Sequence, residues 1–220
     1  MAGKLIVVEG IDGSGKATQS KLLHDYYAEI GQPVRLVTFP DYASPSSTLV
    51  KMYLAGEIGD GRVESVNAYA ASSFYAADRY ISFKNGWSKD YQWGVVIADR
   101  YVTSNLIHQM VKLPKKEWPD FITWLEDYEY NKLGLPRPDL VIYLDLPVDT
   151  ALALMDARYD GDDTKKDIHE KNRGYLIACL KAADYAASSL GWRCIACTEQ
   201  GAMRSIEAIA EDIKKYTAWL

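Results

Sequence analysis

Cysteine is scarce in this chain, and its pattern carries no obvious chemistry. Three cysteines in 220 residues exclude a fold held together by disulfides. Cys194 and Cys197 form a C-x-x-C pair inside an apolar segment. No second pair and no histidine cluster accompanies them, so the sequence lacks the context of a zinc or redox site. We expect these two residues to be plain buried thiols.

The chain also lacks an excess of basic residues and any long hydrophobic run. Lysine and arginine number 25 against 30 aspartate and glutamate residues, which gives a formal net charge of −5. Non-specific binding of nucleic acid needs a positively charged surface, so no nucleic-acid partner is expected. No stretch approaches the roughly 18 apolar residues of a membrane span, and Leu5–Val8 is too short for a signal core. By elimination we expect a soluble, cytoplasmic protein without a membrane partner.

What the chain does contain is an alternation of short apolar runs and longer helical patterns. The runs are rich in valine and isoleucine and indicate buried strands: Leu5–Val8, Val34–Phe39, Val95–Ala98, Leu140–Leu146 and Arg193–Cys197. Helical spacing is found over Thr18–Ile30, Val63–Phe83, Trp118–Leu133, Val148–Arg158 and Ile168–Leu190. Strands separated by helices predict an α/β fold with a five-stranded parallel sheet flanked by helices. We expect one domain over residues 1–220.

A glycine-rich loop, GIDGSGK at residues 10–16, follows the first expected strand and precedes the first expected helix. Glycines let the backbone turn so that several N–H groups face one concavity, and the helix N-terminus adds partial positive charge. Lys16 would bring a full charge to the β- and γ-phosphates of a nucleotide. In this context the pattern predicts the phosphate-binding loop of a P-loop protein.

One position of the loop departs from the usual pattern. A serine or threonine normally follows the lysine and ligates Mg²⁺, but here the residue is Ala17. Thr18 is rotated by about 100° along the helix and does not replace it directly. Either water and carboxylates hold the magnesium, or it is held poorly. Ala17 also leaves open a nucleotide-binding protein without turnover.

Two further segments suggest phosphate chemistry. Asp99 and Arg100 end the third expected strand, where parallel sheets bind ligands. An arginine fork suits phosphate and a carboxylate suits magnesium, although the pair could also anchor a helix start. The polar stretch at residues 159–166, YDGDDTKK, lies between two expected helices. It is either a solvated connector or a lid that closes over a reactive anion.

Six segments in order make the chain resemble the thymidylate kinases, a branch of the P-loop nucleoside monophosphate kinases. They are VEGIDGSGK at 8–16, FPDY at 39–42, FYAADR at 74–79, DRY at 99–101, YLDLP at 143–147 and DIHE at 167–170. The resemblance covers nearly the whole chain. It implies a five-stranded P-loop kinase fold with a short lid, usually a homodimer. The implied reaction transfers the γ-phosphoryl group of ATP to dTMP with Mg²⁺.

The resemblance also implies three sets of site residues. The ATP phosphates would be held by Gly10, Asp12, Gly13, Ser14, Gly15, Lys16, Ala17 and Thr18. Catalysis would use Lys16, Asp99, Arg100, Arg158 and Lys166. The dTMP site would comprise Asp12, Phe39, Pro40, Tyr42, Tyr75, Arg79, Arg100, Asn105 and His108.

Individual roles follow from the same resemblance. Asp99 would organise magnesium and its waters, Tyr75 would stack on thymine, and Arg79 would hydrogen-bond the base. His108 would lie beside the sugar or simply pack. The family often has a cis bond before the proline of the Phe39–Pro40 pair. Because no arginine lies between residues 10 and 15, the catalytic cation would come from a lid at about residues 158–167.

Two alternative functions remain open on the sequence. The first is a related kinase with another acceptor, either another nucleoside monophosphate or a deoxynucleoside. In a deoxynucleoside kinase, Asp41 at the end of the second expected strand could be the base for a nucleoside hydroxyl. The alternative from another class is the noncatalytic nucleotide-binding protein suggested by Ala17. The presence of Lys16, Asp99 and Arg100 together favours turnover over simple binding.

Overall fold

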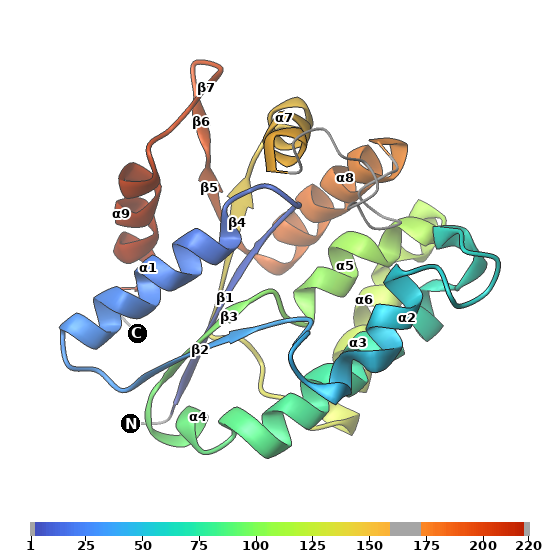
Figure 1. The fold of residues 1–220 in the computed structure, drawn as a ribbon, viewed down its shortest axis with the longest axis horizontal. Coiled ribbons are helices and arrows are strands. Elements are labelled where there is room, and N and C mark those ends of the chain that lie inside the picture. The colour runs from blue at the N-terminus through green and yellow to red at the C-terminus, as the bar shows by residue number, and fades with distance from the viewer. Residues whose placement is uncertain (1–2, 159–172, 218–220) are drawn as a thin grey trace.

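Five parallel strands form the central sheet of the computed structural model, which describes residues 3–158 and 173–217 (Figure 1). The strands are β1 (Lys4–Gly10), β2 (Val34–Thr38), β3 (Val95–Asp99), β4 (Leu140–Asp145) and β5 (Arg193–Ala196). Their order is β2-β3-β1-β4-β5, and every neighbouring pair is parallel. The predicted sheet is confirmed, because all five expected strands are present with ends shifted by only one or two residues.

Helices surround this sheet on both faces. They are α1 (Lys16–Glu29), α2 (Thr48–Leu54), α3 (Ala68–Ser82), α4 (Asp90–Trp93), α5 (Thr103–His108), α6 (Trp118–Glu126), α7 (Val148–Arg158), α8 (Arg173–Leu190) and α9 (Ile206–Thr217). A small hairpin, β6 (Thr198–Glu199) and β7 (Ala202–Met203), projects after β5 (Figure 1). π-helical segments extend α3 over Phe83–Trp87 and α6 over Asp127–Lys132.

The side-chain alternation of β1 explains the three layers. Leu5 and Val7 belong to the core cluster under α3, α5, α6 and α8. Ile6 and Val8 face the other way and join the cluster under α1 and α9. Residues that alternate along a strand point to opposite faces, so a fully apolar strand needs helices on both sides. Figure 1 shows this arrangement, with α1 and α9 on one side of the sheet and α3, α5, α6 and α8 on the other.

The predicted helices differ from the observed ones mainly at their ends. The helix expected from Val63 begins only at Ala68, because the Asn67 side chain caps it by accepting a hydrogen bond from the Ala70 N–H at 2.8 Å. The helix expected over Trp118–Leu133 becomes π-helical after Glu126. The helices α2, α4, α5 and α9 lie outside the predicted ones. The first three have four to seven residues and carry too little periodicity to be recognised. The prediction missed α9 although its twelve residues bury Ile209, Ala210 and Ile213 on one face.

The expectation of two buried cysteines is wrong for one of them. Cys197 is buried, but Cys194 is exposed. β5 is an edge strand of the sheet, and of its four residues only Ile195 is buried. Within residues 3–158 and 173–217, no cluster of three histidine, cysteine or acidic side chains could hold a metal ion. Over the same residues, no helix is long and apolar enough to cross a membrane.

The core on the α1 side gives a stability prediction. Ile142 on β4 is 0% exposed, so Ile142→Ala should lower the free energy of unfolding by about 2–5 kcal/mol through lost burial and a residual cavity. The matched control is Ile30→Ala, because Ile30 is 53% exposed at the end of α1. That change should cost less than about 0.5 kcal/mol. Urea unfolding of the three proteins measures both values, and equal losses would contradict the assignment of Ile142 to the core.

Candidate active site

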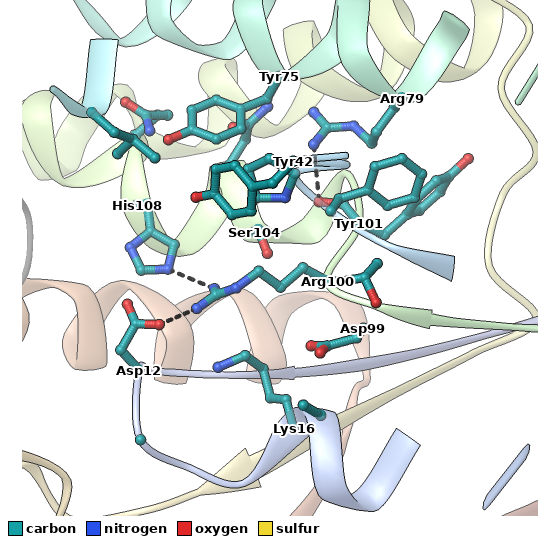
Figure 2. A pocket seen from close by; sticks show the side chains of 18 of the residues that line it. Asp12, Lys16, Tyr42, Tyr75, Arg79, Asp99, Arg100, Tyr101, Ser104 and His108 are labelled. Atoms are coloured by element: carbon teal, nitrogen blue, oxygen red, sulfur yellow. Dashed lines mark hydrogen bonds and ion pairs between the residues drawn. The ribbon is translucent and has the colours of Figure 1, made fainter. Parts of the chain in front are cut away.

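A cavity of about 470 Å³ opens at the carboxyl ends of β1, β2 and β3 (Figure 2). Its volume is in the range of small-molecule sites. The residues lining it are Asp12, Gly13, Gly15, Lys16, Ala17, Thr18, Thr38, Phe39, Pro40, Tyr42, Leu54, Tyr75, Arg79, Asp99, Arg100, Tyr101, Ser104, Asn105, His108 and Gln109. The edge of the sheet at which the sequence predicted ligand binding therefore carries the cavity.

Most of the expected site residues gather around this one cavity. Among the expected residues that the structure describes in full, only Gly10 and Ser14 do not line it. Ser14 is buried, and a Cβ atom on Gly10 would stand 2.4 Å from the Ser14 hydroxyl oxygen, so glycine is required there. Lys166 and most of the expected lid lie outside the described residues. The structure describes Arg158 only as the last residue of α7.

The phosphate loop places Lys16 at the floor of the cavity. Gly15 adopts a left-handed conformation with φ of 85°, and α1 begins at the next residue. The Lys16 side chain is largely buried, and its Nζ donates a hydrogen bond to the Ile11 carbonyl oxygen at 2.8 Å. Loss of hydration on burial, together with the Arg100 charge, lowers the pKa of Lys16 to about 8. An anion in the cavity would favour its charged form.

Arg100 lies opposite Lys16 and is held by two side chains. Its backbone is left-handed, with φ of 68°. Its guanidinium forms an ion pair with Asp12 and donates to His108 Nε2 at 3.1 Å (Figure 2). Burial lowers the pKa of Arg100, but the Asp12 and Glu9 carboxylates outweigh that effect and raise it overall. Arg100 is therefore a permanent, oriented cation at the rim of the phosphate loop.

A buried carboxylate that the sequence did not single out fixes the turn carrying Arg100. Glu9, at the end of β1, is 0% exposed. It accepts hydrogen bonds from the Tyr101 backbone N–H at 3.1 Å, the Thr103 hydroxyl at 2.7 Å and the Ser104 hydroxyl at 2.8 Å. Burial raises its pKa, while Arg100 and these hydroxyl donors oppose the rise. Glu9 thus ties the end of β1 to the start of α5.

Asp99 is the carboxylate best placed for a magnesium ion. It is nearly buried at the end of β3 and lines the cavity beside Lys16. Burial raises its pKa, and the Lys16 and Arg100 charges oppose this. Magnesium in kinase sites typically takes one or two carboxylates and completes its shell with phosphate oxygens and waters. Asp99 fits this requirement, Ala17 adds no ligand, and Thr18 places a hydroxyl-bearing residue on the cavity wall.

The opposite part of the cavity is aromatic and amide-lined. Tyr75 and Arg79 both reach it from α3, which confirms that they share one helix face. The Tyr75 ring packs edge-on against Tyr53, with ring centroids 6.3 Å apart. Tyr42 is more than half exposed, and Figure 2 shows it between Tyr75 and Arg100. The Phe39–Pro40 bond is cis, as the family resemblance suggested.

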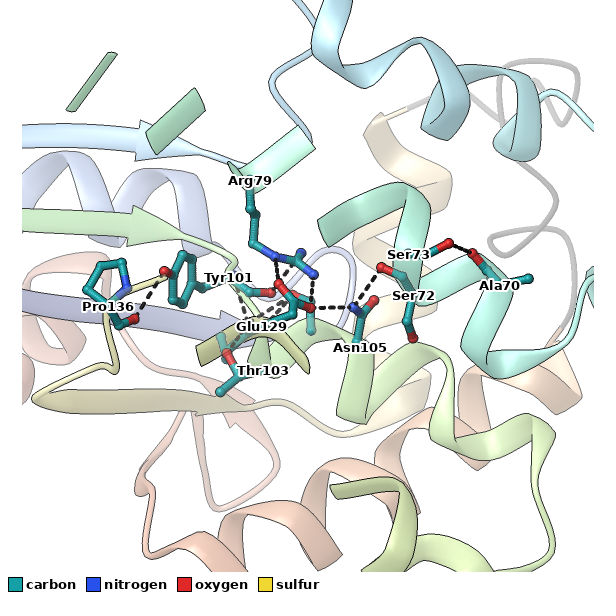
Figure 3. A network of polar contacts seen from close by, with 11 residues as sticks. Ala70, Ser72, Ser73, Arg79, Tyr101, Thr103, Asn105, Glu129 and Pro136 are labelled. Atoms are coloured by element: carbon teal, nitrogen blue, oxygen red, sulfur yellow. Dashed lines mark hydrogen bonds and ion pairs between the residues drawn. The ribbon is translucent and has the colours of Figure 1, made fainter. Parts of the chain in front are cut away.

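Arg79 is bound to a partner that sequence reasoning missed. Its Nε donates to Glu129 Oε2 at 2.7 Å and its Nη2 to Glu129 Oε1 at 2.5 Å (Figure 3). The Asn105 Nδ2 donates to the same Oε1 at 3.2 Å. Glu129 is 0% and Arg79 only 1% exposed. Burial raises the pKa of Glu129, while the Arg79 guanidinium lowers it.

The sequence analysis did not identify Glu9 and Glu129 as site residues, for different reasons. Glu9 stands in the apolar strand and could have been noticed as a charge that needs partners. Glu129 lies in the segment DYEYNK, which looks like a solvated helix face. Glu129 nevertheless follows buried Leu125 by four residues and buried Ile122 by seven, so helical spacing places it on the core-facing side. Its partner Arg79 lies 50 residues away in the sequence, which local patterns do not reveal.

Comparison with known proteins agrees with this geometry. The family model for thymidylate kinase matches residues 8–200. A probable thymidylate kinase of Pyrococcus abyssi is 34% identical over 214 residues, covering 97% of this chain and 95% of the relative. The thymidylate kinase of Mycobacterium tuberculosis is 32% identical over 150 residues, covering 67% and 68%.

Solved structures give the same answer for the fold. The structure of thymidylate kinase from Candida albicans matches with a TM-score of 0.69 at 21% identity, over 99% of this chain and 92% of that one. At that identity the likeness concerns the fold alone. The family model and the relatives rest on sequence, and together with the phosphate loop and the cavity they show that this chain belongs to the thymidylate kinase family.

Proposed function

We propose that this protein transfers the γ-phosphoryl group of ATP to dTMP, giving dTDP and ADP. One observation carries the proposal. A single cavity joins a phosphate loop, with Lys16 and Arg100, to a pocket lined by Tyr75, Arg79 and Asn105. The first part suits the phosphates of a donor and an acceptor, and the second suits a flat base.

The phosphate end supplies charge and position. Phosphoryl transfer spreads negative charge over the transferred oxygens and needs little covalent chemistry from the protein. Loop N–H groups and Lys16 would hold the donor phosphates. Arg100, kept in place by Asp12 and His108, would stabilise charge between the donor and acceptor phosphates. Holding both reactants in line supplies a large part of the rate enhancement.

Magnesium and a lid cation complete this proposal. Asp99 would hold the ion, directly or through water, and the ion would neutralise charge on the β- and γ-phosphates. Arg158 or Lys166 would supply the further positive charge. Arg158 is the last residue of α7, and Lys166 comes after it in the chain.

The base end supplies recognition. Tyr75 would stack on thymine, Arg79 and Asn105 would face the base edge, and His108 would lie beside the sugar. Phe39, Pro40 and Tyr42 follow the end of β2 and would form the wall between the base and the acceptor phosphate. Aromatic faces with a few fixed polar groups are typical of such pockets.

The two alternatives receive less support. Asp41 does not line this cavity but a separate one beside Trp87, and its backbone N–H donates to Asp78 Oδ2 at 2.8 Å. A base for a nucleoside hydroxyl would need to reach the reacting group. The noncatalytic alternative is disfavoured because Lys16, Asp99 and Arg100 all line the same cavity.

The same proposal covers the domain organisation, location and oligomeric state of the enzyme. We expect one kinase domain spanning residues 1–220, a cytoplasmic location and a homodimer. Its substrates would be ATP and dTMP, with no nucleic-acid or membrane partner. The acidic net charge of −5 supports the absence of a nucleic-acid partner.

The direct test offers several acceptors to the full chain. ADP formation from Mg-ATP is followed with dTMP, dUMP, dCMP, dGMP, AMP and thymidine in separate assays. We expect the fastest turnover with dTMP. Turnover with thymidine instead would transfer the assignment to a nucleoside kinase. Binding of ATP without turnover of any acceptor would establish the noncatalytic alternative.

Lys16 should be essential for turnover but not for folding. Lys16→Ala removes the one positive charge of the phosphate loop at residues 10–16, and we expect kcat to fall by at least about 100-fold. Lys21→Ala is the matched control, since Lys21 lies on the same helix with an exposed side chain paired to Asp25. Steady-state kinetics and melting temperatures of both variants make the comparison. Similar rates in the two variants would remove Lys16 from its assigned role.

The lowered pKa of Lys16 predicts a pH dependence of ATP binding. Above about pH 8 the free lysine loses its proton, whereas bound phosphates favour the charged form. ATP affinity should therefore fall as pH rises through 8, by up to about tenfold per pH unit. Titration calorimetry between pH 6.5 and 9.5 measures it.

Lys16→Arg serves as the control because arginine stays charged over this range. Its ATP affinity should remain level between about pH 7 and 9.5. Burial also lowers the pKa of Lys112 to about 8, but that lysine contacts Tyr53 and Val66 away from the cavity. A decline that persists in Lys16→Arg would assign the titration to another group.

A further inference from the structure

The contacts of Arg79 leave a defined part of its guanidinium for a ligand. An arginine carries five N–H donors. Two of them point at the Glu129 carboxylate, and a third donates from Nη1 to the Tyr101 carbonyl oxygen at 3.3 Å (Figure 3). The remaining two hydrogens belong to Nη1 and Nη2. Because Arg79 lines the cavity, these are the donors that it can offer to a bound molecule.

Asn105 is oriented by the same carboxylate. An ionised glutamate only accepts hydrogen bonds, so the asparagine must turn its Nδ2 group toward Glu129. That nitrogen donates to Glu129 Oε1 at 3.2 Å and makes a longer contact, 3.5 Å, with the Ser72 carbonyl oxygen. Both Nδ2 hydrogens are thereby used. The Oδ1 atom is what Asn105, a residue of the cavity wall, can present to a ligand.

The cavity wall thus displays a donor from Arg79 beside an acceptor from Asn105. Thymine and uracil carry the complementary pair, the O4 acceptor next to the N3–H donor. Cytosine carries the reverse, an N4 amino donor next to an N3 acceptor. A cytosine placed in the same position would set donor against donor and acceptor against acceptor. Unpaired buried polar groups are the strongest source of discrimination in such sites.

We propose that Glu129 is the positioning residue that sets this donor–acceptor pattern and thereby selects imide bases, thymine and uracil, over cytosine. This inference rests on the proposed function, because that function places the base of the acceptor nucleotide against Arg79 and Asn105. Glu129 does not line the cavity and acts only through these two side chains. Its place in a π-helical segment is consistent with such a role, since π-helical turns are common at functional sites.

Glu129→Gln tests this assignment because glutamine has the shape of glutamate but replaces one of its two acceptor oxygens with a donor amino group. A glutamine that keeps its oxygen on Arg79 Nε places its amino group at the Oε1 position. There the amino group faces Asn105 Nδ2 and also removes the acceptor of Arg79 Nη2. Asn105 would then present Nδ2 instead of Oδ1 to the cavity. Dissociation constants of dTMP, dUMP and dCMP are measured by calorimetry on the full chain, so the readout does not depend on turnover.

In Glu129→Gln we expect the preference for dTMP over dCMP to fall about tenfold or more. The dTMP-to-dUMP ratio and the affinity for ATP should stay unchanged, because both bases are imides and ATP binds at the other end. Glu129→Asp remains an acceptor and should keep the preference even if dTMP binds more weakly. Asp212→Asn removes another 2.5 Å ion pair, with Arg204, away from the cavity and should change none of these values.

Three results would overturn the proposal. The first is an unchanged preference for dTMP over dCMP in Glu129→Gln with both affinities retained, the second is the same unchanged preference with both affinities weakened equally, and the third is a wild-type protein that binds the two nucleotides equally. Failure of the wild-type protein to bind any deoxynucleoside monophosphate would instead remove the proposed function. The two failures are therefore distinguishable.

A measurement on the wild-type protein covers the case in which Glu129→Gln does not fold. The Nε–H of Arg79 donates to a buried carboxylate, so its NMR signal should exchange slowly with solvent. Arg79→Lys assigns that signal by its loss. The signal should stay protected when dTMP is added, because the hydrogen bond from Arg79 Nε to Glu129 persists while the base binds. Loss of protection on dTMP binding would mean that Arg79 leaves Glu129, which overturns the proposal.

Discussion

The contact between the Glu9 carboxylate and the start of α5 is the constraint on which the active site depends. Glu9 ends β1, and it accepts hydrogen bonds from Tyr101, Thr103 and Ser104 just after β3. The phosphate loop leaves β1 one residue later. One buried side chain therefore fixes the distance between the loop that carries Lys16 and the turn that carries Arg100. The left-handed Arg100 backbone lies within this turn, and its N–H donates to the Val8 carbonyl oxygen at 3.1 Å.

A buried glutamate that accepts several hydrogen bonds is found at two places around the cavity. Glu9 accepts hydrogen bonds from the turn that follows Arg100, and Glu129 accepts hydrogen bonds from Arg79 at the other end of the cavity. The partners of the two arginines differ in their position relative to the cavity. Arg100 is shared between Asp12 and His108, which both line the cavity, whereas Arg79 is fixed by a carboxylate outside it.

Much of this arrangement follows from local sequence. Apolar runs predicted all five strands, and the GIDGSGK loop predicted Lys16 at a helix start, because both signals lie within a few neighbouring residues. The pairing of Arg79 with Glu129 spans 50 residues and brings together two separate helical segments. The exposure of Cys194 depends on which strand ends up at the sheet edge. Such features arise from tertiary packing, which periodicity and spacing do not encode.

The cost of burying Glu129 and Arg79 argues that the pair has a role beyond stability. Removing two charges from water carries a penalty that their attraction only partly offsets, and well-packed apolar residues of similar volume often stabilise a core as well or better. What an apolar pair cannot do is hold a guanidinium plane and an amide in one orientation. Glu129 does both, through two bonds to Arg79 and one to Asn105. The energy spent on burial is thus best understood as preorganisation, because the base meets polar groups whose directions are already fixed.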